Sequence, residues 1–229
     1  MKIFISLMLG FVLVFANEID EFDDEFKDKT EVFDPLSGYN RVMTNVNDFL
    51  YVNIFNPAIR GYNYVVPQPA REAAGNFFDN LLFPLRFVNN LLQFKFKEAG
   101  EETLRFVANT IIGFGGLTDG AKYYDLQRHD EDFGQTLGYW GVGSGFHVVL
   151  PILGPSNLRD IVGLAGDYFA DPISYINPSS RASGIQIYRR GNSWSLDPDA
   201  YENLKKDAVD LYPFLRDAYE QRRNYLIKE

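Results

Sequence analysis

The chain of 229 residues contains no cysteine and only two histidines. Without cysteine it has no disulfide, no thiolate nucleophile and no cysteine-bound zinc, and we expect it not to be a lipoprotein, because acylation needs a cysteine. It also lacks a basic excess, since 31 acidic residues outnumber 22 lysines and arginines. Nucleic acid is therefore not an expected partner, because a phosphate backbone requires a basic surface.

Catalytic motifs are missing as well. The run from His129 through Asp130 and Glu131 to Asp132 contains metal-ligand side chains, but consecutive loop positions rarely converge on one ion. We interpret it as a solvated acidic turn. Ser144 stands between glycines in the wrong frame for a hydrolase elbow, and the nearby glycines precede an apolar segment rather than a helix with Lys-Ser or Lys-Thr. The sequence predicts no enzyme, no metal and no cofactor.

The N-terminus has the composition of an export signal. Residues 1–16, MKIFISLMLGFVLVFA, combine one lysine with an apolar run that ends in a small residue. A membrane span would need about 20 apolar residues, so a cleaved signal peptide is predicted. Residues 17–33 are acidic and predict a solvated tether. The remaining residues, 34–229, are predicted to form a single domain.

Helical periodicity dominates this domain, and no stretch of it is long enough to span a bilayer. Residues 40–55 place apolar side chains such as Val42 and Val46 opposite polar ones such as Asn47, and we expect this helix to stop near Pro57. Further helices are predicted between Pro69 and Pro84 and over residues 85–92, 98–112 and 156–169.

The C-terminal third is less clear. Residues 177–195 are ambiguous, and a short strand around Ile187 fits their pattern. Asp197 and Pro198 predict the N-cap and first turn of a final helix. The 20 phenylalanines are interpreted mostly as core, whereas the 14 tyrosines and two tryptophans suit a boundary between water and hydrocarbon.

Glycine gathers in one connecting segment, residues 113–156, whose most concentrated part is GQTLGYWGVGSG at residues 134–145. A connection of this length inside a compact domain is usually functional. Two interpretations remain open. The glycines provide a flexible loop, or they permit close backbone packing at a tight turn.

Several long segments carry a family resemblance. They are DPLSGYNRVMTNVNDFLY (34–51), VPQPAREAAGNFFDNLLFP (66–84), RFVANTIIGFGGLTD (105–119), DFGQTLGYWGVGSGFHVVLPILGPSNLRD (132–160) and LRDAYEQRRNYL (215–226). In this order, and over almost the whole domain, the sequence resembles the MlaA family, also called VacJ.

The resemblance implies a mainly α, single-domain ring of amphipathic helices around a central amphipathic channel, with a long loop rich in glycine and aromatic residues. It implies a place on the periplasmic side of the outer membrane, in its inner leaflet beside a trimeric outer-membrane porin. Mislocalised outer-leaflet phospholipid would pass through the channel to a periplasmic phospholipid carrier protein, which maintains lipid asymmetry. Members of the family are not enzymes.

Two departures from the family pattern stand out. Most relatives carry a cysteine after the signal peptide, where this chain reads VFANEID, and relatives usually have Pro-Tyr where it has Phe146 and His147. Membrane attachment would then depend on the helices and on a partner protein. The alternative function that stays open is a non-transport envelope scaffold that binds a porin.

Two groups of candidate site residues follow from the mixed faces of residues 40–55 and from the resemblance. The predicted lipid gate consists of Asn45, Val46, Asn47 and Asp48. The predicted flexible loop beside the pore, with its hinge at the first two residues, consists of Phe133, Gly134, Gly138, Tyr139, Trp140, Gly141, Gly143 and Gly145.

Overall fold

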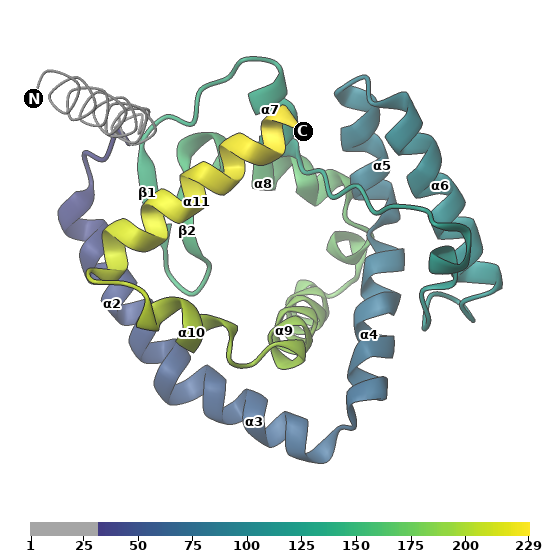
Figure 1. The fold of residues 1–229 in the computed structure, drawn as a ribbon, viewed down its shortest axis with the longest axis horizontal. Helices are drawn as coiled ribbons and strands as arrows, with labels where there is room; N and C mark the ends of the chain where they lie inside the picture. The colour runs from purple at the N-terminus through teal and green to yellow at the C-terminus, as the bar shows by residue number, and fades with distance from the viewer. Residues whose placement is uncertain (1–31) are drawn as a thin grey trace, which may run out of the picture. The chain divides into compact units, whose positions relative to one another are not determined.

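The computed structural model describes residues 32–229, of which Asp34–Glu229 form one compact unit. The predicted signal peptide and residues 17–31 of the predicted tether lie outside the described residues. The unit is mainly helical, as predicted, and its sheet consists of two antiparallel strands (Figure 1). Within the described residues, no helix is both long enough and apolar enough to cross a membrane.

The first helix is longer than expected. Helix α2 (Ser37–Leu50) continues through a π-helical turn, η1 (Tyr51–Phe55), directly into α3 (Asn56–Val65). The expectation that it stops near Pro57 is wrong. Pro57 stands in the first turn of α3, directly after the π-helical turn, and proline is tolerated in a first helical turn.

The next helices agree with the predicted periodicity. Helix α4 (Gln68–Leu81) is followed by α5 (Phe83–Leu92), which has Pro84 in its first turn, and by α6 (Phe96–Ile111). Proline fits these first turns because the backbone N–H groups there have no partner within the helix. Pro69 marks the start of α4, as predicted, and Pro84, predicted as the end of that helix, stands in the first turn of α5.

Part of the predicted glycine-rich loop is helical. After η2 (Gly120–Tyr124), helix α7 (Phe133–Tyr139) includes Phe133, Gly134, Gly138 and Tyr139. The loop prediction is wrong for these four residues. The Asp132 side chain accepts the Gln135 N–H at 2.8 Å and starts the helix. Trp140, Gly141, Gly143 and Gly145 do lie in a connection, which leads into the strands.

The two strands form a hairpin, β1 (His147–Leu150) and β2 (Gly154–Asn157), in which His147 pairs with Asn157. The chain then enters α8 (Leu158–Ala170), whose first turn is capped by the Asn157 side chain. As predicted, α8 ends before Asp171, which caps the short η3 (Pro172–Tyr175).

After β2, every regular element of the described chain is helical. Helix α9 (Ser179–Leu196) covers the ambiguous segment, so a strand around Ile187 is wrong. Hydrogen bonds to α4 hold it: the Asn192 amide donates to the Arg71 carbonyl at 2.9 Å, and Arg71 donates to the Ser195 carbonyl. These tertiary contacts override the short strand-like pattern.

The predicted final helix is in fact two helices, α10 (Ala200–Lys206) and α11 (Leu211–Lys228). Asp199, rather than Asp197, precedes α10. The Asp210 side chain accepts the Tyr212 N–H at 3.3 Å and starts α11. Because of this second cap, the segment that the apolar spacing predicted to be one helix forms two.

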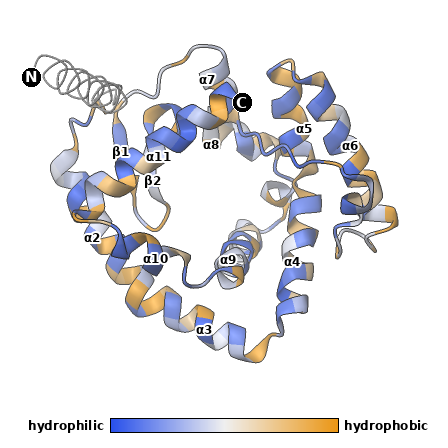
Figure 2. Ribbon diagram, in the orientation of Figure 1, coloured by the Kyte–Doolittle hydropathy of each residue, from blue (hydrophilic) through white to orange (hydrophobic). Residues whose placement is uncertain are grey.

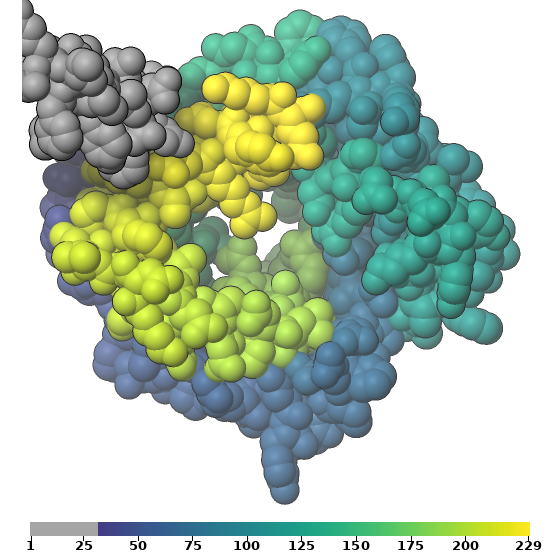
Figure 3. All heavy atoms as spheres, viewed as in Figure 1, coloured from purple at the N-terminus to yellow at the C-terminus, as the bar shows by residue number. Residues whose placement is uncertain are grey.

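Helices of the unit follow one another around a ring (Figure 1). The arc begins with α2, η1 and α3 and continues through α4 and α5, and α11 closes it by contacting both α2 and α7. Helix α9 packs against α3 and α4 on the inner side of this arc. In the space-filling view an opening remains at the centre, between α11, α10 and α9 (Figure 3).

The polarity of the ring is inverted relative to a water-soluble protein. In α2 the buried residues are Asn40 and Thr44, whereas Val42, Val46 and Phe49 are exposed. Hydrophobic and hydrophilic residues likewise alternate along the other ring helices (Figure 2). Across the described residues, buried polar and charged residues outnumber buried apolar ones.

The same pattern recurs in three further helices. Their buried polar or charged residues are Arg86, Asn89 and Asn90 in α5, Glu102 and Arg105 in α6, and Arg159 and Asp160 in α8. Their exposed apolar residues are Val88 and Leu91 in α5, Leu104, Val107 and Ile111 in α6, and Val162 and Leu164 in α8. The interpretation of most phenylalanines as core is wrong, because Phe78 is the buried phenylalanine of the described residues and many others are exposed. Large apolar rings exposed in this number are typical of an interaction surface rather than of a core.

Candidate functional site: the interior of the ring

The hairpin is attached to α2 by two asparagine side chains. The Asn40 amide donates to the His147 carbonyl at 3.0 Å and accepts the Val149 N–H at 2.8 Å. About two turns further along α2, the Asn47 amide donates to the Leu150 carbonyl at 2.9 Å and accepts the Ile152 N–H at 2.7 Å. Each amide thus bonds the hairpin backbone through one donor and one acceptor, as a neighbouring strand would. Asn47 does so at the tip of the hairpin.

The four predicted gate residues do not lie together. Asn45 and Val46 are exposed, whereas Asn47 and Asp48 are partly buried on the other side of α2. The Asp48 carboxylate accepts two hydrogen bonds from the Lys205 amine, at 2.7 and 2.8 Å, and so connects α2 to α10. Successive helix residues differ by about 100° in direction, so four in a row cannot share one face.

Arg223 of α11 organises a cluster of charges that we call the ion-paired corner, comprising Asp132, Asp160, Tyr219 and Arg223. Its guanidinium donates to both Asp132 oxygens, at 2.6 and 2.8 Å, and to Asp160 at 3.0 Å. The Tyr219 hydroxyl donates to the other Asp160 oxygen at 2.7 Å. Asp132 precedes α7 and Asp160 lies in α8, so Arg223 holds three helices together.

Glycines bring α7 and α8 into contact beside this corner. A Cβ on Gly163 would lie 2.6 Å from the backbone nitrogen of Gly134 and 2.8 Å from its Cα. A Cβ on Gly134 would lie 2.5 Å from an Asp160 oxygen. Side chains larger than hydrogen do not fit at either position.

The remaining glycines of the segment differ among themselves. Gly141 and Gly145 have φ of +87° and +70°, which glycine adopts at little cost. A Cβ on Gly143 would meet nothing within 4 Å. The segment therefore combines close packing in α7 with turn-forming glycines after it, so each of the two interpretations describes part of it.

A carboxylate with a perturbed pKa adjoins the corner. The Asp167 carboxylate accepts the Phe133 N–H at 2.9 Å, at the start of α7. Burial, together with the nearby charge of Asp132, raises the pKa of Asp167 to about 6. The surroundings oppose ionisation of Asp167, because its hydrogen bonds do not offset the burial.

The acidic run at residues 129–132 is not a solvated turn. Glu131 is buried and accepts hydrogen bonds from Gln93 at 2.7 Å and from Lys95 at 2.5 Å, and Asp132 belongs to the ion-paired corner. The His129 ring lies 2.6 Å from Glu101. Among the described residues, no three metal-ligand side chains are grouped so that they could hold an ion.

His147, one of the two departures from the family pattern, is buried within β1. Its Nδ1 lies 3.1 Å from the Glu220 carboxylate of α11, which also accepts from the Asn157 amide at 3.2 Å. The ring stands edge-on to Tyr219 at 6.1 Å between centroids. A histidine at this position thus connects the hairpin to the C-terminal helix.

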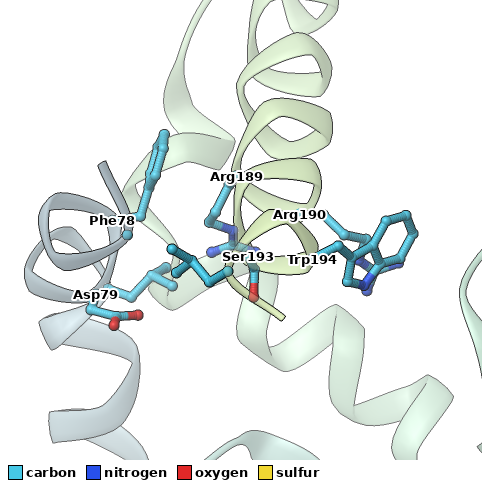
Figure 4. A pocket seen from close by; sticks show the side chains of 9 residues that line it. Phe78, Asp79, Arg189, Arg190, Ser193 and Trp194 are labelled. Atoms are coloured by element: carbon cyan, nitrogen blue, oxygen red, sulfur yellow. The ribbon is translucent and has the colours of Figure 1, made fainter. Parts of the chain in front are cut away.

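Two cavities flank α9 and share Arg190 and Trp194. The first, which we call the apolar cavity, has a volume of about 390 Å³ and lies between α9, α3 and the hairpin tip, with Phe55, Ile59 and Ile152 in its wall. The second, which we call the α4 cavity, has about 290 Å³ and lies between α9 and α4. Figure 4 shows Arg190 and Trp194 extending from α9 on the side away from Phe78 and Asp79 of α4.

Sequence reasoning missed this part of the site. The segment around Arg190 had no clear secondary structure, and so the faces of α9 were not considered. The signal that could have found it is the spacing of Arg190 and Trp194, which are neighbours on one helix face only if the segment is helical.

Comparisons with known proteins agree with this fold. Residues 32–226 match the family described as MlaA lipoprotein. The intermembrane phospholipid transport system lipoprotein MlaA of Escherichia coli (strain K12) is 37% identical over 198 residues, which cover 84% of this chain and 78% of that protein. The protein of the same name from Haemophilus influenzae is 27% identical over 90% of this chain and 84% of the relative.

A solved structure also matches, described as the structural basis for maintenance of bacterial outer membrane lipid asymmetry. Its TM-score is 0.75 at 33% sequence identity, covering 85% of this chain and 98% of that one. The family description and the relatives' names contain the word lipoprotein, which gives no support to the expectation that this chain is not a lipoprotein.

Proposed function

The chain belongs to the MlaA lipoprotein family, and from this premise we propose that it transports phospholipid through its ring at the outer membrane of a Gram-negative bacterium. In this proposal, phospholipid that has strayed into the outer leaflet enters the ring from the membrane. It leaves on the periplasmic side to a carrier protein, and a trimeric porin holds the ring in place. The protein performs no covalent chemistry on the lipid.

The inverted polarity of the ring is the observation that supports this function. Moving a two-chain phospholipid into water exposes about 30 methylenes at about 0.8 kcal/mol each, or roughly 25 kcal/mol. Moving its charged head through hydrocarbon costs several kcal/mol more. Ring helices that expose apolar residues and bury polar ones fit a surrounding of hydrocarbon better than one of water.

A cluster of exposed aromatic rings supports the position at a membrane. Trp140 and Phe94 are both exposed and lie 5.4 Å apart between ring centroids, and the Trp140 indole donates to the Leu92 carbonyl at 3.0 Å. Tryptophan with one polar contact and one apolar face suits the interface between headgroups and hydrocarbon. We include in the proposal that Tyr139 and Trp140 anchor the protein at this boundary.

Of the predicted gate residues, we assign the gating role to Asn47 and Asp48, which contact the hairpin tip and α10. Asn45 and Val46 then belong to the membrane-facing side of the same helix. Deleting Val46 and Asn47 would rotate every later side chain of the helix by about 200°, which we expect to misdirect the channel. The hinge role of Phe133 and Gly134 stays a prediction.

The first experiment tests transport itself. The full chain is expressed in a Gram-negative host that lacks its own MlaA relative, and phospholipid at the cell surface is measured with a membrane-impermeant label. We expect surface phospholipid to fall to the level of the unmodified host, and phospholipid to copurify with the protein by mass spectrometry. A scaffold would stabilise the envelope without either result, and that outcome would overturn the proposal.

The second experiment tests the gate. Asn47→Leu removes both hydrogen bonds to the hairpin tip, and we expect surface phospholipid to rise about two- to fivefold above the wild-type level. Asn53→Leu is the matched control, because the exposed Asn53 amide donates only to the Phe49 carbonyl of its own helix, at 2.9 Å. Equal surface phospholipid in the two variants would remove Asn47 from the gate.

A further inference from the structure

Arg190 occupies an unusual position inside the ring. It lines both the apolar cavity and the α4 cavity, and as a residue it remains exposed. Its side chain leaves α9 together with Trp194 (Figure 4). The guanidinium is therefore accessible to a molecule that enters either cavity.

The charge of Arg190 has no counter-ion among the described residues. No carboxylate there lies within 4.0 Å of it, whereas Arg105 is paired with Asp119 at 3.1 Å and Arg128 with Asp79 at 2.6 Å. The neighbouring Arg189 reaches Asp171 only at 4.0 Å. Of these two adjacent arginines, Arg190 therefore carries a positive charge without a carboxylate partner among the described residues.

The surroundings oppose that charge. The residue as a whole is exposed, but its charged group is partly shielded from water by the surrounding protein. This burial, and then the charge of Arg189, lower the pKa of the Arg190 guanidinium. An arginine stays protonated even so. A bound anion would relieve both effects, and so the site favours an anionic ligand.

The wall beside Arg190 is apolar. Phe55 and Ile59 of the long first helix, Ile152 of the hairpin tip and Ile187 of α9 line the same cavity. Its volume of about 390 Å³ lies within the usual range for small-molecule sites, about 300–1,000 Å³. A ligand that uses both features must carry an anionic group next to a hydrocarbon chain.

We propose that Arg190 binds the phosphodiester of a glycerophospholipid while the lipid inserts part of an acyl chain into the apolar cavity. This inference rests on the proposed function and adds a binding site for the lipid inside the ring. A guanidinium presents two parallel N–H donors to two phosphate oxygens, and such charge-assisted pairs are about twice as strong as neutral hydrogen bonds. The site would hold the lipid by its phosphate irrespective of the group esterified to it.

The test compares lipids with and without a phosphate. The full chain, in mild detergent, is incubated with dioleoyl phosphatidylglycerol or with dioleoylglycerol, which has the same acyl chains and no phosphate, and bound lipid is counted by native mass spectrometry. For Arg190→Gln we expect about tenfold weaker binding of phosphatidylglycerol and unchanged binding of dioleoylglycerol. Arg190→Lys, which keeps the charge without the paired donors, is expected to fall between wild type and Arg190→Gln.

Arg181→Gln is the matched control. Arg181 lies in the same helix, is exposed and lines neither cavity, and its substitution changes the net charge equally. We expect this variant to bind both lipids like the wild type. Equal losses in the two variants would assign the effect to overall charge and overturn the site, and thermal melting of each variant checks that it is folded.

Failure of the inference differs from failure of the proposed function. If wild type and Arg190→Gln bind phosphatidylglycerol equally, phosphate recognition by Arg190 is wrong, although transport stands. If oleic acid competes as strongly as phosphatidylglycerol, the site recognises any amphiphilic anion and the phosphodiester assignment is overturned. If the wild type binds no phospholipid, the proposed function itself fails.

Discussion

Two regions of the ring differ in whether their arginines are paired with carboxylates and in how closely their helices pack. In the ion-paired corner Arg223 contacts two carboxylates, and the backbones of α7 and α8 touch through Gly134 and Gly163. Along α9, Arg190 has no carboxylate partner among the described residues, and cavities flank the helix on two sides. The same residue types therefore hold the fold together in one region and leave binding capacity in the other.

The largest effect is expected from removing the central cation of the corner. Arg223→Gln leaves Asp132 and Asp160 facing each other in a partly buried setting, and we expect it to lower the free energy of unfolding by about 3 kcal/mol. Arg190→Gln should change it by less than about 0.5 kcal/mol. Denaturant unfolding of both variants measures this, and equal losses would contradict the division into two regions.

The second comparison uses glycines. Gly163→Ala places a methyl group 2.6 Å from the backbone of Gly134, which cannot move aside as a side chain can, and we expect a loss of about 2 kcal/mol. Gly184→Ala in α9 meets nothing within 4 Å, and should gain about 0.5–1 kcal/mol because alanine favours the helix. Thermal melting should give shifts of opposite sign, and a loss in both would contradict the proposed openness around α9.

The third prediction concerns pH. The folded-state pKa of Asp167 is raised to about 6, above its value in an unfolded chain, so the folded state binds a proton more readily. The contribution of Asp167 to stability is therefore present below about pH 4 and is lost as the pH rises through about 6. Asp167→Asn should remove this loss and raise stability at pH 7.5 by about 1.5 kcal/mol, after discounting for solvent screening.

The measurement is melting temperature against pH. The wild type should lose stability between pH 4 and 6 relative to Asp167→Asn, whose amide oxygen can still accept the Phe133 N–H. Parallel curves for the two proteins would show that the carboxylate is ionised without cost, and the corner would then be less tightly packed than its distances indicate.

The smallest effects are expected in the connection after α7. Gly141→Ala forces alanine into a φ of +87° and should cost about 1 kcal/mol, whereas Gly143→Ala meets open space and should be neutral within about 0.5 kcal/mol. If the loop moves during transport, as the sequence suggested, the variant that combines Gly141→Ala and Gly143→Ala slows lipid transfer while the protein stays folded. Normal transfer by a folded double variant would remove the loop from gating.

Much of the helical framework could be predicted from the sequence, because proline and capping residues act locally. The amphipathic character of α2 followed from the spacing of Val42 and Val46 against Asn47. The sequence did not show which face of α2 is buried, because periodicity separates an apolar face from a polar one without showing whether water or hydrocarbon surrounds the helix. The exposed phenylalanines were misread for the same reason.

The site was less accessible to sequence reasoning. Hydrogen bonds to Arg71 determine that the segment around Arg190 is helical, and Arg71 is more than 100 residues away in sequence. Likewise, the partners of Asp132 and Gly134 lie in α8 and α11, so local patterns could not separate a packed glycine from a flexible one. The glycine count was informative, but the role of each glycine depended on its neighbours in space.

The π-helical turn at Tyr51–Phe55 has a consequence for the shape of the molecule's rim. Each inserted residue advances the direction of later side chains by about 100°, so the turn acts as a phase correction within one long rod. Large apolar or aromatic side chains of this rod are exposed both before the turn, as at Phe49, and after it, as at Tyr64. Removing a single residue from this segment would rotate the apolar face of α3 by about 100° relative to that of α2.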